Sequence, residues 1–453
     1  MRSLFNPQPP LFSQWPNHQY DGQLKNADKI LDRNLQSIQL VYDDLLAGKE
    51  NGTSGANGMT AEQVLRAGLI KQQNCWSYQE LAINCADSGM TRAFVRLDDG
   101  QTFRKSCLQE NISKIRGETW YKINELLVLD AKESDIEAGR TVRIDATVIE
   151  ANIHYPTDSS LLFDCIKVAN RVLKSIREEH RGFRVYSPVK VSSAKKLVLK
   201  IINAKNSDER KGYYRKLLRM AKELEVRLPN IIGKLIALAT KTPADLERHI
   251  KDIKNVVELL PLIIGQTEKR IIQGKEVPPE EKIVSIFEVH TDIISKGKRE
   301  TEFGHKVFLT AGKSGLILDC QLVQGNPGDS EYFMDLIERQ KQLYGRAPRQ
   351  TTADGGFASE ENVLDAKIAG VTDVCFSKRC GMTIEEMVKS QWVFEKLRNF
   401  RAGIEGLISV LKRAFGLDRA MWKGVSGFAS YVHSAVAAYN LAVMSRHMAA
   451  ADD

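Results

Sequence analysis

The sequence predicts an α/β protein whose core is a mixed sheet, with an all-helical domain before it and a basic helical insertion within it. Three observations support this prediction. An alternating β-branched run at 141–149 stands far upstream of the other strand patterns, which begin near residue 304. The stretch between them has helical periodicity and carries most of the excess positive charge. From residue 28 to 140 the patterns are helical.

Composition places the chain among ordinary globular proteins. It has 453 residues, 43% hydrophobic and 27% charged, which predicts about two to four domains. The one long apolar run, 428–445, contains His433 and Asn440, so we expect a buried C-terminal helix within 426–453 and no membrane span. The N-terminus has no signal-peptide pattern and the seven cysteines form no Cys-x2-Cys pair, which predicts a cytoplasmic protein with reduced thiols.

The N-terminal part is predicted as a polar, mobile arm at 1–27 and a helical domain at 28–140. Thr60 and Ser77 are each followed three residues later by Gln or Glu, which predicts capping boxes, and Thr102 is a further candidate cap. An apolar stripe with heptad-like spacing belongs to a core or pairs two protomers; it comprises Leu31, Leu35, Ile38, Tyr42 and Leu45.

Asp145 lies in the middle of the first predicted strand, TVRIDATVI. Alternation puts Arg143, Asp145 and Thr147 on one face and apolar residues on the other. An acid inside a β-branched run serves neither a turn nor a helix cap. It is therefore either a hydrogen-bonded core residue or a functional carboxylate.

Asp354 ends a short strand in RQTTADGGF. Asp-Gly is a common turn signal, and this is the alternative to a functional role. The position favours function, because glycines after the acid let a ligand or a backbone come close.

Glu405 belongs to a predicted amphipathic helix over 397–415. At 100° per residue, Arg398, Arg401, Glu405 and Lys412 occupy an arc of about 60° beside an apolar face. A lone acid among three cations suits metal binding and phosphate contact, whereas a solvated ion pair with Arg401 is the alternative. Gly403 and Gly406 each cost about 1 kcal/mol relative to Ala in a helix, which indicates close approach of another backbone or of DNA.

The remaining elements complete an alternating order of strands and helices. Lys306–Ala311 and Leu316–Val323 predict a hairpin, and Asp329 or Ser330 is expected to cap the next helix. The strand before Asp354, a short helix and a strand at 372–376 follow. We therefore divide the core into 141–157 and 286–425.

The excess positive charge is concentrated between the two pieces of this core. The whole chain has a formal net charge of +8, and residues 167–241 contain 20 Lys and Arg against 6 Asp and Glu, hence +14. This block lies in the predicted helical insertion, 158–285, whose first helix is expected to be capped by Thr157 or Asp158. A solvated helix face is one interpretation; contact with DNA is the other. The candidate DNA contacts are Lys195, Lys196, Arg210, Lys211, Arg215 and Lys216.

Four segments resemble bacterial insertion-sequence transposases of the DDE type, and among these the ISNCY group. They are RIDATVIEANIHYPTDSSLL (143–162), FGHKVFLTAGKSGLILDCQLVQGNPGDSEYF (303–333), TADGGFAS (352–359) and FRAGIEGLISVLKRAFGL (400–417). Many such transposases have a Tyr-x2-Arg-x3-Glu-x6-Lys signature. Arg401, Glu405 and Lys412 match it, whereas Arg398 stands at the Tyr position. The phosphate contact made by that Tyr is therefore either lacking here or supplied by Arg398.

The resemblance implies an RNase H-like catalytic core with Asp145, Asp354 and Glu405 as catalytic acids and metal ligands. Two Mg²⁺ ions (Mn²⁺ can substitute) would be held per active site, with Asp145 bridging them. Arg398, Arg401 and Lys412 would contact DNA. The N-terminal helical domain would be either a helix-turn-helix that reads the terminal repeats or a packing and dimerisation domain. The implied activity is cleavage at the terminal inverted repeats, followed by joining of the 3′-hydroxyl ends to target DNA.

The implied partners are double-stranded DNA, as terminal repeats and as target, and further copies of the chain in a dimer or higher assembly. The expected location is the bacterial cytoplasm, in association with the nucleoid. Two alternatives stand beside the active transposase. One is a catalytically inactive, DNA-binding descendant; the other is an RNase H-like metal-dependent nuclease without strand transfer. The presence of all three acids and the Arg-x3-Glu-x6-Lys spacing favour the transposase.

Overall fold

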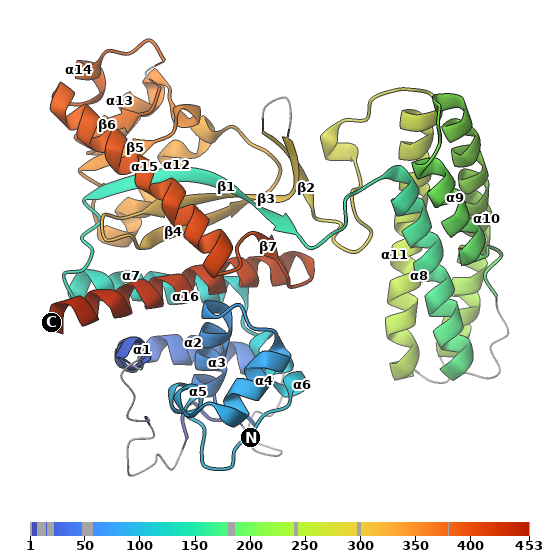
Figure 1. The fold of residues 1–453 in the computed structure, drawn as a ribbon, viewed down its shortest axis with the longest axis horizontal. Coiled ribbons are helices and arrows are strands. Elements are labelled where there is room, and N and C mark those ends of the chain that lie inside the picture. Colours follow the sequence, from blue (N-terminus) through green and yellow to red (C-terminus); the bar gives the residue numbers. More distant parts are fainter. Residues whose placement is uncertain are drawn as a thin grey trace. The chain divides into compact units, whose positions relative to one another are not determined.

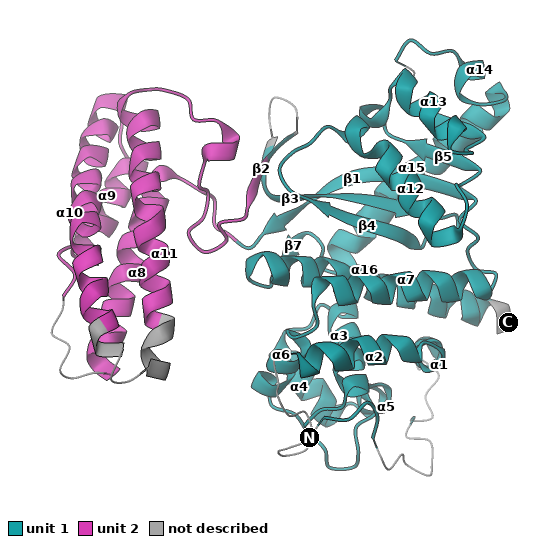
Figure 2. Cartoon of the chain, turned by 180° about the vertical axis from the view of Figure 1, so that it is seen from behind, with its two compact units in different colours: residues 1–152, 294–453 teal, residues 153–293 magenta. Residues whose placement is uncertain are grey.

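The computed structural model describes residues 2–6, 15, 22–47, 58–179, 186–239, 243–296, 300–378 and 380–452. The chain forms two compact units (Figure 2). One comprises residues 1–152 and 294–453 and contains the sheet; the other comprises residues 153–293 and is helical. The helical unit corresponds to the predicted insertion 158–285 and extends a few residues beyond it at both ends.

The sheet of the first unit is mixed and has β1 (Thr141–Ala151) at its centre (Figure 1). On one side β1 pairs antiparallel with β3 (Glu300–Ala311), which pairs antiparallel with β4 (Ile317–Val323) and borders β2 (Asp292–Lys296). On the other side β1 pairs parallel with β5 (Gln350–Ala353), and β5 with β6 (Asp373–Phe376). The far end of β1 also pairs with β7 (Arg419–Ala420). The predicted strands are present; β2 and β7 were not predicted.

Helices between the strands cover the sheet and enclose its core. α12 (Asp329–Tyr344) follows β4, the 3₁₀ turn η3 (Gly355–Phe357) and α13 (Glu360–Ile368) follow β5, and α14 (Ile384–Met387) and α15 (Gln391–Ala414) follow β6. α15 packs against β1, β5 and β6 (Figure 1). The buried core side chains include Ile144, Phe308, Phe333, Phe357, Phe376 and Leu397. An α/β core with helical regions is thus confirmed.

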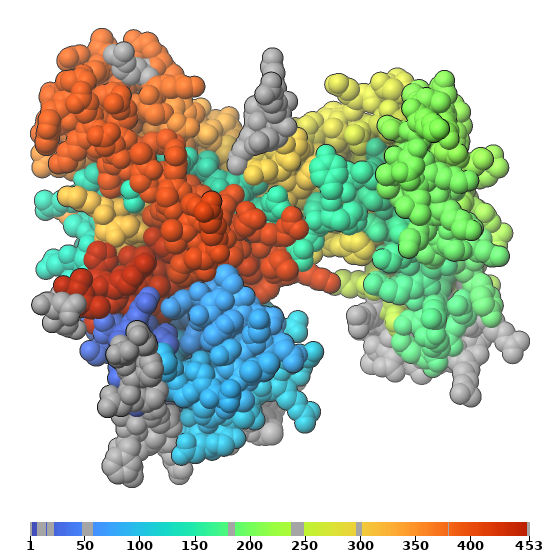
Figure 3. Space-filling model, in the orientation of Figure 1, coloured from blue at the N-terminus to red at the C-terminus, as the bar shows by residue number. Residues whose placement is uncertain are grey.

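The N-terminal helices and the C-terminal helix share a second core. α1 (Gly22–Arg33), α2 (Leu35–Leu46), α3 (Ala61–Gln73), α4 (Tyr78–Asp87), α5 (Gly89–Val95), α6 (Lys105–Ile112) and α7 (Gly117–Glu133) form the helical part. The long α16 (Gly424–Asp452) packs against α1, α3 and α7, so chain ends that are distant in sequence lie together (Figure 3). Its buried residues, including Val432, Val436 and Leu441, agree with the prediction of a buried C-terminal helix. No helix in the described ranges combines the length and the apolar character that a bilayer crossing requires.

The predictions of helix N-caps were partly correct. Thr60 and Ser77 both form the predicted capping boxes, with Gln63 and Glu80. Thr102 does not cap, because α6 begins only after Arg104. The cap of α12 is Gly328, without a side-chain hydrogen bond, whereas Asp329 is the first helical residue and forms an ion pair with Lys306.

The arm and the apolar stripe at the N-terminus also differ from the prediction. Most of 1–27 lies outside the described residues, but Ser3 and Leu4 accept hydrogen bonds from the backbone at the start of α3, and α1 already begins at Gly22. The predicted stripe is split at Asn34, whose side chain donates to the carbonyl of Ile30 (2.8 Å). Within this unit its members Leu31, Ile38 and Leu45 are core residues.

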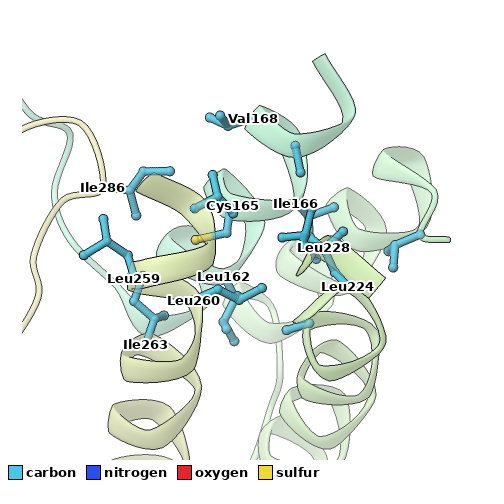
Figure 4. Close-up of a cluster of buried hydrophobic side chains, with 14 of the residues drawn as sticks. Leu162, Cys165, Ile166, Val168, Leu224, Leu228, Leu259, Leu260, Ile263 and Ile286 are labelled. Atoms are coloured by element: carbon cyan, nitrogen blue, oxygen red, sulfur yellow. The ribbon is translucent and has the colours of Figure 1, made fainter. Parts of the chain in front are cut away.

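The second unit is a bundle of α8 (Asp158–Glu179), α9 (Val191–Ile202), α10 (Ser207–Ala239) and α11 (Pro243–Thr267), followed by the short helical segments η1 (Glu268–Ile272) and η2 (Pro279–Glu281). Leu162, Cys165, Leu224, Leu260 and Ile263 from three helices converge in its core (Figure 4). Thr157 caps α8, as predicted, by accepting the N–H of Ser160 (3.1 Å). Aliphatic packing on one face of each helix leaves the cationic residues on the outer faces.

Candidate active site

Two of the three predicted acids are brought together by the parallel pairing of β1 and β5. The register pairs Ile144 with Ala353, so the next residue on each strand, Asp145 and Asp354, stand side by side. Asp145 remains within β1, because β1 continues along β3, whereas Asp354 directly follows β5 and is the N-cap of the turn η3. The carboxyl ends of parallel strands are a common place for binding sites in α/β proteins.

Glu405 approaches the same point from α15. Val393, Leu397, Ile404, Leu407 and Leu411 bury one face of this helix, which fixes the adjoining cationic face at the margin of the sheet. The exposed fractions of the three acid side chains rise from 13% for Asp145 to 48% for Asp354 and 66% for Glu405. The three acids therefore range from a nearly buried side chain on the central strand to a mostly exposed one on α15.

Arg401 joins the three acids. Its Nη2 lies 3.2 Å from Asp145 Oδ2 and 3.7 Å from Asp354 Oδ1, and its Nη1 donates to Glu405 Oε1 at 2.9 Å. The guanidinium side chain is only 17% exposed, and its Nε has no hydrogen-bond partner among the described residues. Glu405 thus forms the ion pair with Arg401 that the alternative interpretation predicts, but this pair is part of a four-residue cluster, and the role of Glu405 stays a prediction.

The acids differ in their affinity for protons. Burial raises the pKa of Asp145 to about 6, although Arg401 and the N–H of Ala146, which donates to Oδ1 at 2.8 Å, act in the opposite direction. Burial also acts upward on Asp354, but its hydrogen bonds and nearby cations outweigh this effect and lower its pKa. Asp145 is therefore the carboxylate whose ionised form would gain most from an additional positive charge nearby.

Two site residues were missed by sequence reasoning. Ser377 follows β6 and donates its hydroxyl to Asp354 Oδ1 at 2.7 Å. Lys378 lies over Gly355, where an added Cβ would be 2.8 Å from Lys378 Cδ, and it contributes to the lowered pKa of Asp354. The available signal was their place directly after the strand at 372–376, which the register sets beside Ala353.

Arg143 accounts for the presence of a glycine at position 403, one of the two glycines within α15. Its guanidinium stacks on the ring of Phe400 (4.8 Å to the centroid) and donates to the Phe400 carbonyl at 3.2 Å. A Cβ on Gly403 would stand 2.1 Å from Arg143 Nη1. The close approach at Gly403 is therefore made by an arginine side chain rather than by another backbone, and a Cβ on Gly406 would have no other atom of the described chain within 4 Å outside its own helix backbone.

The other predicted DNA contacts fall into two groups. Arg398 and Lys412 share the face of α15 with Arg401, and neither forms an ion pair with a described residue. Lys195, Lys196, Arg210, Lys211, Arg215 and Lys216 lie on α9 and α10 of the helical unit. Five of these six are exposed, Lys211 is half-buried, and none pairs with a carboxylate of the described part of the chain.

The donor set of the site suits a hard cation. Carboxylate oxygens are the side-chain ligands preferred by Mg²⁺, and Asp145, Asp354 and Glu405 supply them. Within the described ranges no three acidic, His or Cys side chains are grouped closely enough to hold an ion. The cation that contacts the three acids in this structure is the guanidinium of Arg401. The assignment of the acids as metal ligands therefore stays a prediction.

One comparison with known proteins bears on the site. Residues 284–441 match the model of a protein family described as "Transposase DDE domain". This segment contains Asp354, Arg401 and Glu405 but not Asp145, which lies before the helical unit. The match confirms the predicted similarity to insertion-sequence DDE transposases; it does not test the ISNCY group. A search of curated proteins and a search of solved structures found no match.

Proposed function

We propose that this protein, whose residues 284–441 carry a transposase DDE domain, is an active DDE transposase related to the ISNCY group. It binds the terminal inverted repeats of its insertion sequence, cleaves DNA at the element ends and joins the 3′-hydroxyl ends to target DNA. The observation that carries the proposal is the convergence of Asp145, Asp354 and Glu405 on one guanidinium, from two strands and a helix.

The strand order supports an RNase H-like core. Three antiparallel strands, β4, β3 and β1, are extended by the parallel strands β5 and β6 on the other side of β1. The acids come from the centre of the first strand, the end of the fourth core strand and a following helix. This arrangement gives each carboxylate its own rigid support, as a site for phosphodiester chemistry requires.

Asp145, Asp354 and Glu405 would hold two divalent ions, Mg²⁺ or Mn²⁺. When bound, such ions activate the attacking oxygen and stabilise the leaving oxygen of the phosphodiester. Ser377 and Lys378 help to lower the pKa of Asp354. Arg401 can bind a phosphate only after part of its guanidinium leaves the carboxylates, because both its Nη atoms face them.

The remaining cations would hold DNA. Arg398 and Lys412 extend the positive face of α15 beyond the acids, suited to the scissile strand and the terminal nucleotides. The unpaired cations of α9 and α10 present positive charge without internal neutralisation, which favours contact with phosphates. The N-terminal helices would read the repeats or join protomers in a dimeric or higher synaptic assembly.

The test is strand cleavage with the full chain. Labelled duplex carrying the repeat that flanks the gene is incubated with Mg²⁺, Mn²⁺ or EDTA, and products are compared for wild type, Asp145→Asn, Asp354→Asn and Glu405→Gln. We expect metal-dependent nicking at the repeat terminus, lost in each variant. Glu395→Gln is the matched control, since Glu395 is exposed on the same helix and hydrogen-bonds to Gln391.

A second readout separates the alternatives. Strand joining is measured with a pre-cleaved 3′-hydroxyl end and a supercoiled target. Nicking without joining would identify a nuclease. Repeat binding without nicking, in either metal and on supercoiled DNA, would identify an inactive descendant.

A further inference from the structure

A cavity of about 780 Å³ lies in the first unit, away from the acids. It is bounded by the end of α3, the start of α4, the end of α6 and the first turns of α16. Cavities of about 300–1,000 Å³ are typical of small-ligand sites. Nothing in the proposed cleavage chemistry uses it.

The most unusual residue lining the cavity is Lys71. Its residue surface is only 7% exposed, and its ammonium forms no hydrogen bond or ion pair with the described part of the chain. Its neighbours are two rings: Tyr78, 4.8 Å from Nζ to the centroid, and Trp422, 5.6 Å away. A buried ammonium without an anionic partner is costly, so burial lowers the pKa of Lys71 to about 8.

Aromatic side chains make up much of the remaining wall. Trp76 and Tyr431 join Tyr78 and Trp422 around the space, and the rings of Trp422 and Tyr431 meet edge to face at 5.7 Å. Tyr431 is anchored by donating its hydroxyl to the Gly416 carbonyl at 3.0 Å. Tyr431 is thus held by a hydrogen bond and packs edge to face on Trp422, and aromatic rings of this kind can serve as a stacking platform.

Polar groups around the rings favour an anion. Lys423 and the first turn of α16, at Ser426 and Gly427, line the same cavity, and a helix N-terminus carries partial positive charge. Glu80 is the one acid among the lining residues, and its carboxylate accepts the N–H of Ser77 at 2.7 Å. The hydroxyl of Ser113 and the amide of Gln109 add hydrogen-bonding groups.

We propose that this cavity binds a single nucleotide, with its base stacked among Trp76, Tyr78 and Trp422 and its phosphate on Lys71. A planar ring system and a phosphate together satisfy the two features that the cavity combines: aromatic walls and a buried, unpaired cation. A purely apolar ligand would leave Lys71 without a counter-charge, and inorganic phosphate would leave the rings without a partner. The nucleotide is either free or an unpaired residue of a DNA strand.

The test measures binding, not cleavage, so it is independent of the proposed transposase activity. The full chain is titrated calorimetrically at pH 7 with 5′-dAMP and with deoxyribose 5-phosphate. We expect 5′-dAMP to bind and the base-free sugar phosphate to bind much more weakly. Lys71→Met and Trp422→Leu should each weaken 5′-dAMP binding about ten-fold or more. Lys132→Met is the matched control, because Lys132 also lies over a tyrosine, Tyr344, at 5.6 Å.

A second arm identifies the source of the nucleotide. A blunt duplex and the same duplex with one unpaired terminal nucleotide are compared for wild type and Lys71→Met. Preference for the unpaired end, lost in Lys71→Met, means that the cavity takes a nucleotide from DNA; 5′-dAMP binding without such preference means a free nucleotide. If wild type neither binds 5′-dAMP nor prefers the unpaired end, or if Lys71→Met behaves as wild type in both arms, the proposal is wrong.

A pH series gives a further check. The groups facing Lys71 are Cys75 and Tyr78, whose pKa values are raised by burial, Tyr431, likewise raised, and Glu80, whose pKa is lowered by hydrogen bonds from Ser77; Lys423 also lines the cavity. Lys71 is then the group expected to lose its charge near pH 8. Affinity for 5′-dAMP should fall between pH 7 and 9 in wild type and stay flat in Lys71→Met; the same fall in both would contradict the role of Lys71.

Discussion

Arg401 Nη2 stands 3.2 Å from Asp145 Oδ2, so the most deeply placed acid of the site is paired with an arginine of the same site. The same guanidinium contacts Asp354 and Glu405. Three carboxylates around a single cation leave a net negative charge, and the raised pKa of Asp145 reflects this together with its burial. The metal-free protein is therefore stabilised at this point by Arg401, which a bound cation would partly replace.

Arg401→Met should destabilise the metal-free protein. Removing the guanidinium leaves three carboxylates facing one another, at a cost of about 2 kcal/mol in the free energy of unfolding. Mg²⁺ or Mn²⁺ should restore more stability to this variant than to wild type. Thermal unfolding in EDTA and in each metal measures both effects.

The control for Arg401→Met is Arg413→Met on the same helix, where the arginine is exposed. It should unfold like wild type in every condition. Equal metal-induced shifts in Arg401→Met and wild type would mean that Arg401 and a metal ion do not share the carboxylates.

Asp145→Asn should stabilise the metal-free protein at neutral pH. Because the pKa of Asp145 is raised from 3.8 to about 6 in the folded state, the folded protein holds this proton more tightly than the unfolded chain. Stability from this group is present at low pH and is lost as pH rises from about 4 to 6. The loss amounts to about 2–3 kcal/mol, and Asn does not titrate.

Denaturant unfolding in EDTA across pH 4–8 measures this difference. Wild type and Asp145→Asn should converge near pH 4 and separate by pH 7, with the variant more stable. Asp418→Asn, at an exposed position, should show no such separation. A variant that is less stable than wild type at pH 7 would contradict the dominance of burial at Asp145.

Gly403→Ala and Gly406→Ala should change stability in opposite directions. Alanine favours the helix by about 1 kcal/mol over glycine at either position. At Gly403 the new Cβ would meet Arg143 Nη1 at 2.1 Å. We expect this to outweigh the gain, because Arg143 would have to give up its hydrogen bond to the Phe400 carbonyl and its place on the Phe400 ring. At Gly406 nothing lies within 4 Å. Melting temperatures of the two variants test this directly, and stabilisation by both would show that Arg143 moves aside without cost.

Cations of the helical unit should determine the salt dependence of DNA binding. Replacing Lys195 and Lys196 by Gln should reduce the slope of log K against log salt by nearly one unit for each phosphate that the protein no longer neutralises. Lys174→Gln is the control, since Lys174 already pairs with Glu178 on α8. Filter binding of non-specific duplex over a range of salt gives the slopes, and an unchanged slope in the double variant would remove α9 from the DNA-binding surface.

Sequence reasoning succeeded where the signal is local. The capping boxes at Thr60 and Ser77 need only four residues each, and the amphipathic face of α15 follows from its own periodicity. Asp145 was recognisable because an acid within a β-branched run serves neither a turn nor a helix cap. These features do not depend on what packs against them.

Sequence reasoning failed where the role of a residue depends on a contact with a distant part of the chain. Ser377 became a site residue only through the register of β5 and β6, and Gly403 through an arginine from β1. The two-residue strand β7 has no alternation to detect and exists because β1 offers it an edge.

The packing of α16 constrains how the chain is made. Asn26 on α1 donates to the Ser445 carbonyl, and Gln72 on α3 donates to that of Phe415, so the first helices bury their apolar faces against the last. At about 5–20 residues per second, the ribosome needs roughly 20–70 s to add those final helices after α3 has emerged. During that time the nascent N-terminal helices expose apolar surface, which makes them clients for chaperones. A product truncated before α16 would be unable to complete the core that α16 shares with α1, α3 and α7, and we expect it to be degraded rapidly.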